Sequence, residues 1–249
     1  SYREYMIMYH NIHLPLVSLS DILHNSVAIC EEVNKRCRPL EHFTHYLQQG
    51  YYPFGAEGFA TYNQRVENTV ELLLNIELPQ LRKVDIGNIR KLKALLSVLA
   101  SEVPMLVDTA KLSTLLGISR NTLLAYLEYL DEAKLIKRLY SDDLSVKKMQ
   151  KPDKILMDNC NLLKVLALKE PNIGTLRETF FCNQLGYQHQ VEYSKQGDFL
   201  IDHQITFEIG GQAKEGKQVA AVENAYIVAD DIEYSYGNKL PIWLFGLLY

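Results

Sequence analysis

The spacing of hydrophobic and polar residues divides the chain into three parts, and the first of them is helical. Up to about residue 101, apolar residues recur at steps of three and four, which is typical of amphipathic helices. Ser1 and Glu4 have the spacing of a capping box, Ser20 is a candidate helix cap, and Pro39 suits the first turn of a helix. The predicted helices cover residues 21–37, 39–49, a longer stretch that ends at 75, and 86–100.

A short helix, a turn, a second helix and a strand are predicted between residues 102 and 150. Asp108 and Ser119 are suited to cap the two helices, and Gly117 suits the turn between them. The predicted helices cover 110–116 and 120–130, and the strand covers 135–140. This order is typical of a helix-turn-helix that continues into a wing, so we predict a winged helix.

The remaining residues, 151–249, alternate short strands with helices, which predicts an α/β domain. The expected strands cover 154–158, 190–193, 198–202, 205–209, 225–228 and 242–247, and the expected helical elements cover 175–185 and 217–221. The whole chain is therefore expected to be an α+β multidomain protein with a helical region at 1–101, a winged helix at 102–150 and the α/β domain at 151–249.

Composition narrows the function classes. The 249 residues are 47% hydrophobic, which is sufficient for ordinary cores, and the net charge of -4 argues against coating nucleic acid through bulk charge. The sequence has neither a CxxC pair nor a Cys/His cluster with zinc-ligand spacing, so we expect core thiols at Cys30, Cys37, Cys160 and Cys182. We recognise neither a membrane-spanning run nor a signal peptide, so we expect a cytoplasmic protein with no membrane partner.

Two acidic residues lie on neighbouring predicted strands between residues 197 and 211. If these strands form a hairpin, Asp198 and Glu208 lie at one end of a sheet, as in magnesium-dependent nucleases whose second strand carries Glu-x-Lys. The position for that lysine is Gly210. Lys214 or Lys217, which follow in the sequence, can reach back and place an ammonium group where that lysine would place its own. The sequence therefore predicts either a site with a displaced lysine or an inactive fold with the same frame.

Several short motifs, taken together, resemble the C-terminal portion of a bacterial and archaeal family of AAA-type ATPases. They run from end to end of the chain and comprise Ser1–Tyr5, Gly50–Phe54, Leu115–Arg120, Tyr126–Leu130, Lys151–Ile155 and Phe207–Gly211. The resemblance implies lid helices, a winged helix and a C-terminal domain of unknown function that is similar to the PD-(D/E)xK nuclease fold. The last domain is thus expected to have a restriction-endonuclease-like form.

The chain departs from that family because it contains no Gly-x-x-x-x-Gly-Lys-Ser/Thr phosphate loop. We therefore expect no ATP hydrolysis by this chain alone and no cofactor in it, while ATP and magnesium would belong to a longer parent protein. The missing ATPase core is then an expected partner. The sequence leaves open whether the chain is a fragment of such a protein or a naturally truncated relative.

The nuclease interpretation adds a first acid, Glu178, from the predicted helix at 175–185. Asp198 and Glu208 would then be the ligands of a possible magnesium ion, because Mg²⁺ favours carboxylate oxygens. Lys214 is the residue on which such activity would depend. The alternative is a degenerate fold in which these acids are only solvated.

The second helix of the predicted winged helix offers the candidate DNA contacts. The four residues at its start, Ser119, Arg120, Asn121 and Thr122, can reach phosphates or base edges. Positive charge is sparse there, because Glu128 lies on the same helix and two acids follow it. The alternative is a winged helix that packs against the ATPase core.

These observations support three functions. The first is the accessory or regulatory part of an AAA-type ATPase that binds DNA or a protein partner. The second is a magnesium-dependent nuclease with a displaced lysine. The third is a protein-interaction module with no role on nucleic acid.

Overall fold

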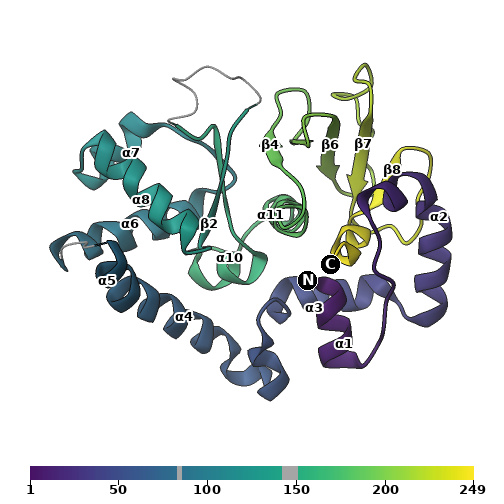
Figure 1. Cartoon of the computed structure of the whole chain (residues 1–249), viewed down its shortest axis with the longest axis horizontal. Coiled ribbons are helices and arrows are strands. Elements are labelled where there is room, and N and C mark those ends of the chain that lie inside the picture. The colour runs from purple at the N-terminus through teal and green to yellow at the C-terminus, as the bar shows by residue number, and fades with distance from the viewer. Residues whose placement is uncertain (83–85, 142–150) are drawn as a thin grey trace.

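Helices build the N-terminal part of the chain in the computed structural model, which describes residues 1–82, 86–141 and 151–249 (Figure 1). The three- and four-residue apolar steps of the sequence predict helices in this part of the chain. The elements are α1 (Tyr2–His10), α2 (Leu19–Arg36), α3 (Pro39–Gln49), η1 (Pro53–Glu57), η2 (Phe59–Thr61), α4 (Tyr62–Leu72), the π-helical η3 (Leu73–Glu77), α5 (Leu78–Arg82) and α6 (Ile86–Glu102).

Reciprocal side-chain caps begin the first two helices. The Ser1 hydroxyl accepts a hydrogen bond from Glu4 N–H and the Glu4 carboxylate accepts one from the Ser1 ammonium group, which confirms the predicted capping box. The predicted cap at Ser20 was wrong. Ser18 caps α2 instead, because Asp21, three residues later, returns a hydrogen bond to its backbone N–H and no acid stands three residues after Ser20.

The middle of the chain joins two helices to a small antiparallel sheet. The predicted caps are confirmed: Asp108 and Ser119 accept backbone hydrogen bonds at the two helix starts, and Gly117 ends the first helix with a left-handed φ of 59°. The elements are β1 (Met105–Leu106), α7 (Thr109–Leu116), α8 (Arg120–Glu132), β2 (Ile136–Leu139) and β3 (Lys154–Met157), and the strand order is β1-β3-β2.

Strand β3 belongs to this small sheet and not to the C-terminal one. The sequence assigned it to the α/β domain, but Ile155 is opposite both Met105 of β1 and Arg138 of β2. A boundary at residue 151 therefore separates two hydrogen-bonded strands, β2 and β3. The sequence could not reveal this pairing because the alternation of a short strand does not identify its partner.

The C-terminal part contains a five-stranded mixed sheet in the order β4-β5-β6-β7-β8. Its first three strands pair antiparallel, and β6, β7 and β8 pair in parallel. The elements are α10 (Cys160–Leu166), α11 (Ile173–Leu185), β4 (Val191–Tyr193), β5 (Phe199–Ile201), β6 (Ile205–Gly210), β7 (Ala225–Ala229), β8 (Lys239–Pro241) and η4 (Ile242–Leu247). The chain is thus a mixed α and β protein with a helical N-terminal region and a C-terminal sheet, as predicted.

Two predicted elements in this part were wrong. Residues 242–247 form the 3-10 helix η4 and not a strand, and every one of them is buried. A short run that is apolar on every side fits a buried strand and a buried helix equally well, so the pattern could not distinguish them. Residues 217–221 form a series of turns and not a helix.

Helix α11 lies between the two sheets (Figure 1). Phe181 on this helix packs against Phe199, Phe207 and Phe245, with ring centroids 5.4, 5.1 and 4.8 Å away. Buried hydrophobic residues from the helices and from both sheets join in one core cluster. Helix α11 therefore connects the small sheet to the larger one through shared packing.

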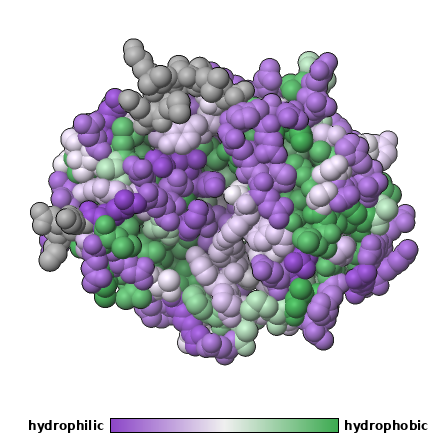
Figure 2. All heavy atoms as spheres, in the orientation of Figure 1, coloured by the Kyte–Doolittle hydropathy of each residue, from purple (hydrophilic) through white to green (hydrophobic). Residues whose placement is uncertain are grey.

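The two ends of the chain adjoin each other (Figure 1), where the Ser1 hydroxyl donates to the Tyr249 backbone carbonyl at 2.7 Å. Hydrophilic residues cover much of the face in Figure 2, with hydrophobic residues between them in smaller groups. Within the described residues, we find no helix with the length and apolar character that a membrane crossing requires.

Candidate functional site

Glu208 is a buried carboxylate on β6, the central strand of the larger sheet. Only 1% of its side chain is exposed, and it lies opposite Ile227 of the parallel strand β7. Its Oε1 is 2.8 Å from the ammonium nitrogen of Lys214. A buried carboxylate is costly unless it is paired, so Lys214 stabilises the charge of Glu208.

The stem of Lys214 lies over Gly210. A Cβ atom at position 210 would come within 2.7 to 2.8 Å of the Lys214 Cβ, Cγ and Cδ atoms. The side chain of Lys214 therefore occupies the space in which a side chain at position 210 would begin. Lys217 behaves differently: it is 86% exposed and pairs with Glu215 at 2.7 Å. Of the two lysines considered from the sequence, it is Lys214 that meets Glu208.

Asp198 lies just before β5 and beside Glu208. Its Oδ2 accepts a hydrogen bond from Ile209 N–H at 2.6 Å, and its own N–H donates to the Phe207 carbonyl at 2.9 Å. Asp198 is thus bonded to the residues on both sides of Glu208. The hairpin brings the two predicted carboxylates to one region, as the sequence predicted.

Glu178, on α11, lies near these residues and forms a separate ion pair. Its Oε2 is 2.5 Å from the ammonium nitrogen of Lys154, which lies on β3. Burial raises the pKa of Glu178, the charge of Asp198 adds to the increase, and Lys154 and Lys214 oppose it. Sequence reasoning missed Lys154, because no local pattern in the chain indicates that residue 154 lies beside the helix that carries Glu178.

The predicted metal ligands meet only part of what a metal site requires. Among the residues that the structure describes, no group of three or more His, Cys, Asp or Glu side chains is arranged to hold a metal ion. Glu208 Oε2, however, is buried and has no hydrogen-bond partner. A buried carboxylate oxygen without a partner, beside a second carboxylate at Asp198, fits a hard cation such as Mg²⁺.

The predicted DNA contacts lie at the start of α8. Ser119 and Thr122 are used locally, because Ser119 Oγ accepts from Thr122 N–H at 3.1 Å and lies 2.8 Å from its hydroxyl oxygen. Arg120 and Asn121 are exposed, while Leu123 behind them is fully buried. Arg120 and Asn121 are therefore the members of this group with side chains available to a partner.

A second polar group surrounds Asp158, which the sequence did not suggest as a functional residue. Its side chain lies at the end of β3, and the residue is only 9% exposed. Its Oδ2 accepts long hydrogen bonds from the amides of Asn159 and Asn183, at 3.3 and 3.5 Å. Burial raises the pKa of Asp158 from 3.8 to about 6, against the hydrogen bond from Asn159 and the charges of Lys137 and Lys134. An acid as the last residue of the strand predicted at 154–158 was the available signal.

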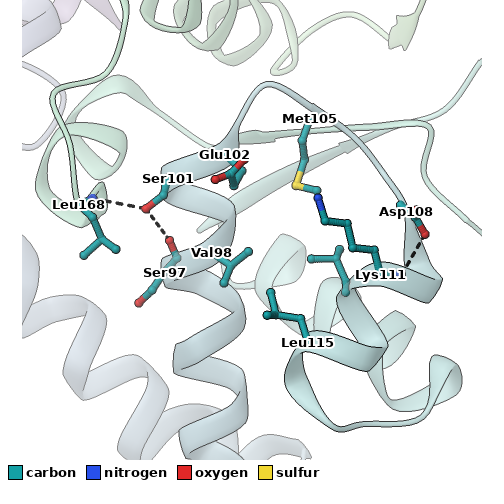
Figure 3. A pocket seen from close by; sticks show the side chains of 10 residues that line it. Ser97, Val98, Ser101, Glu102, Met105, Asp108, Lys111, Leu115 and Leu168 are labelled. Atoms are coloured by element: carbon teal, nitrogen blue, oxygen red, sulfur yellow. Dashed lines mark hydrogen bonds between the residues drawn. The ribbon is translucent and has the colours of Figure 1, made fainter.

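A cavity of about 330 Å³ lies between α6 and α7 (Figure 3). The side chains of Val98, Met105 and Leu115 form its apolar lining, with Lys111 among them and Ser101 at one side. The Ser101 hydroxyl also accepts a hydrogen bond from Leu168 N–H at 3.4 Å. None of the residues that the sequence analysis selected as catalytic, metal-binding or DNA-binding lines this cavity.

The chain belongs to the family described as Domain of unknown function (DUF8612), which matches residues 40–172. The match covers α3 to α10, with both the small sheet and Asp158, and ends before Glu178. A relative in Methanocaldococcus jannaschii, the uncharacterized protein MJ1637, is 24% identical over 277 residues that include all of this chain. The chain spans 58% of the length of that relative. No solved structure matches the chain.

Replacing Lys214 with alanine is expected to lower the free energy of unfolding by about 2 kcal/mol, because it leaves the Glu208 carboxylate buried without its partner. Lys214 is 35% exposed, so solvent screens the pair and the loss stays below that of a fully buried one. Urea unfolding measures the change. Lys217→Ala is the matched control, with an expected effect within about 0.5 kcal/mol. Equal losses in the two variants would contradict the role given to the Glu208 pair.

Proposed function

We propose that this chain hydrolyses phosphodiester bonds with the help of a divalent metal ion, at a site formed by Asp198, Glu208 and Lys214. One observation carries the proposal. The Lys214 ammonium group meets Glu208 while its stem lies over Gly210, the position where a Glu-x-Lys strand would carry its lysine. Lys214 thus places its positive charge beside Glu208, in the region where the lysine of a Glu-x-Lys strand would place its own.

Each residue has a defined part in this proposal. Asp198 and the unpartnered Oε2 of Glu208 would hold Mg²⁺, which when bound acts as a Lewis acid and activates water. Lys214 stabilises the negative charge that develops on the phosphate in the transition state. Glu178, with its raised pKa, is balanced by Lys154 and so limits the repulsion among the three acids.

The strand topology supports the same proposal. A helix, α11, is followed by an antiparallel meander, β4 to β6, and then by β7, which pairs in parallel with β6. Glu208 lies on β6, which pairs antiparallel with β5 and in parallel with β7. This arrangement agrees with the restriction-endonuclease-like form that the family resemblance implies for the C-terminal domain.

A second candidate function is DNA binding by the segment from α6 to β3. The order β1, α7, α8, β2, β3 and the exposed side chains of Arg120 and Asn121 at the start of α8 favour it. The segment would then be the winged helix expected from the sequence, with β2 and β3 as strands of the wing. Either function is compatible with the role expected from the sequence, that of an accessory part of an AAA-type ATPase. The ATPase core would then be a partner of this chain.

Plasmid nicking tests the nuclease proposal. We expect the chain to convert supercoiled plasmid to the open circle in Mg²⁺ or Mn²⁺, and Glu208→Gln and Lys214→Ala to slow this conversion by about 100-fold. Lys217→Ala is the control and should keep the rate of the wild type. Circular dichroism establishes that each variant is folded. Intact plasmid after incubation of the wild-type chain with either metal would refute the proposal.

A further inference from the structure

Two cavities of about 240 and 230 Å³ share the side chains of Lys134 and Asp158 as walls. They lie where the helical region, the small sheet and α11 meet. Neither contains Asp198, Glu208 or Lys214, so they are separate from the site of the proposed hydrolysis. Cavities of this size, joined by two charged residues, are in the range of small-molecule sites when taken together.

The first cavity is cationic. Lys134 and Lys137 line it together with Asn183 and Gly186, and the Lys137 ammonium nitrogen approaches to 3.2 Å from where a side chain at Gly186 would begin. Within the described residues, neither lysine has a carboxylate at ion-pair distance. Two lysine charges, with Asp158 as the one acid in the lining of this cavity, leave an excess of positive charge that favours an anion with several oxygens, such as a phosphate.

The second cavity is aromatic and apolar. The rings of Tyr51 and Tyr52 line it, together with aliphatic residues that include Val66, Val70 and Leu73. The two tyrosine rings stand edge to face, with centroids 5.0 Å apart. A flat ring is the kind of group that packs well against such a surface.

Asp158 stands between the two cavities with one oxygen available. Its Oδ2 accepts from Asn159 and Asn183, whereas its Oδ1 has no hydrogen-bond partner in the part of the chain that the structure describes. The residue is more than nine-tenths buried. A carboxylate in such a position binds hydroxyl donors of a ligand, as acidic residues bind the hydroxyl groups of a ribose.

We infer that the two cavities form one site for a nucleoside 5′-phosphate. The phosphate binds between Lys134 and Lys137, the ribose hydroxyls donate to Asp158, and the base packs against Tyr51 and Tyr52. The charges agree with this ligand, because two lysines and one carboxylate leave an excess of positive charge for a phosphate. The ligand is either a free nucleotide or the 5′-phosphorylated end of a nucleic acid strand, since both present the same chemistry.

Calorimetric titration of the full chain tests this inference, with AMP, GMP, CMP and UMP as probes. At least one should bind, and adenosine, ribose 5-phosphate and inorganic phosphate should each bind at least about tenfold more weakly, because each lacks at least one of the three anchoring groups, phosphate, ribose and base. A 5′-phosphorylated oligonucleotide that binds more tightly than the free nucleotide assigns the site to a strand end, and weaker binding assigns it to free nucleotide.

The double variant Lys134→Ala/Lys137→Ala should weaken binding of the nucleotide at least about tenfold. The matched control is Lys35→Ala/Lys111→Ala, which removes two exposed lysines elsewhere and should leave the affinity unchanged. Asp158→Asn, which keeps an acceptor for Asn159 and Asn183, should remain folded and weaken the nucleotide but not inorganic phosphate. Absence of binding by all four nucleotides, or equal binding by both double variants, would overturn the inference.

Discussion

Asn161→Ala is expected to lower the free energy of unfolding by about 4 kcal/mol, because one buried amide serves four partners. Asn161 lies on α10 and is 1% exposed. Its Oδ1 accepts from Tyr51 N–H at 2.9 Å and from the Tyr62 hydroxyl, and its Nδ2 donates to the carbonyls of Tyr46 and Leu47 at 3.3 and 3.1 Å. Alanine leaves these groups buried without a replacement. The amide therefore ties α10 to the helical region.

Urea unfolding of the variant and the wild type measures this loss. Asn75→Ala is a suitable control, because Asn75 is exposed and donates only to the Glu71 carboxylate on the surface. Its expected effect is within about 0.5 kcal/mol. A loss of only 1 kcal/mol or so for Asn161→Ala would mean that water replaces the amide, and that the cluster is less closed than its burial indicates.

Asp158→Asn is expected to stabilise the protein above pH 6 by about 3 kcal/mol and to have little effect near pH 4. The folded-state pKa of Asp158 is raised by burial from 3.8 to about 6, so the folded protein holds a proton that the unfolded chain has released. Stability from this group is therefore present below pH 3.8, falls as the pH rises to about 6, and stays low above it. The difference of about two pKa units corresponds to about 3 kcal/mol.

Unfolding of both proteins in urea at several pH values between 4 and 8 measures this difference. The gain from Asp158→Asn should grow between pH 4 and 6 and then level off. Asp21→Asn is a contrasting control: Asp21 lies on the surface and its carboxylate accepts hydrogen bonds from Ser18, which lower the pKa of Asp21. That variant should lose stability at neutral pH. A constant difference across the pH range would exclude a buried, titrating Asp158.

Features set by neighbours in sequence could be predicted, and features set by tertiary contacts could not. The caps at Asp108 and Ser119 and the turn at Gly117 depend on residues within four positions, so their pattern was visible in the chain. Lys214 follows Gly210 by four residues and was also within reach of such reasoning. Lys154 meets Glu178 because β3, a strand of the small sheet, packs against α11, which no local pattern indicates.

The same division applies to the two candidate sites. Asp198 and Glu208 come together through a hairpin, which is a short-range event in the chain. The cavities beside Asp158 take their walls from Tyr51, Lys134 and Asn183, which are far apart in sequence. Such a site exists only after the helical region, the small sheet and α11 have packed, so the sequence shows its residues but not their proximity.

The contact between Ser1 and Tyr249 constrains how this chain can be tethered. Any segments attached to the two ends would leave the molecule from one patch of surface and run side by side at their start. With short linkers, they would meet at an effective concentration in the millimolar range, so even a weak affinity between them would hold them together. The two attached segments would then stay together beside the point where both leave the chain.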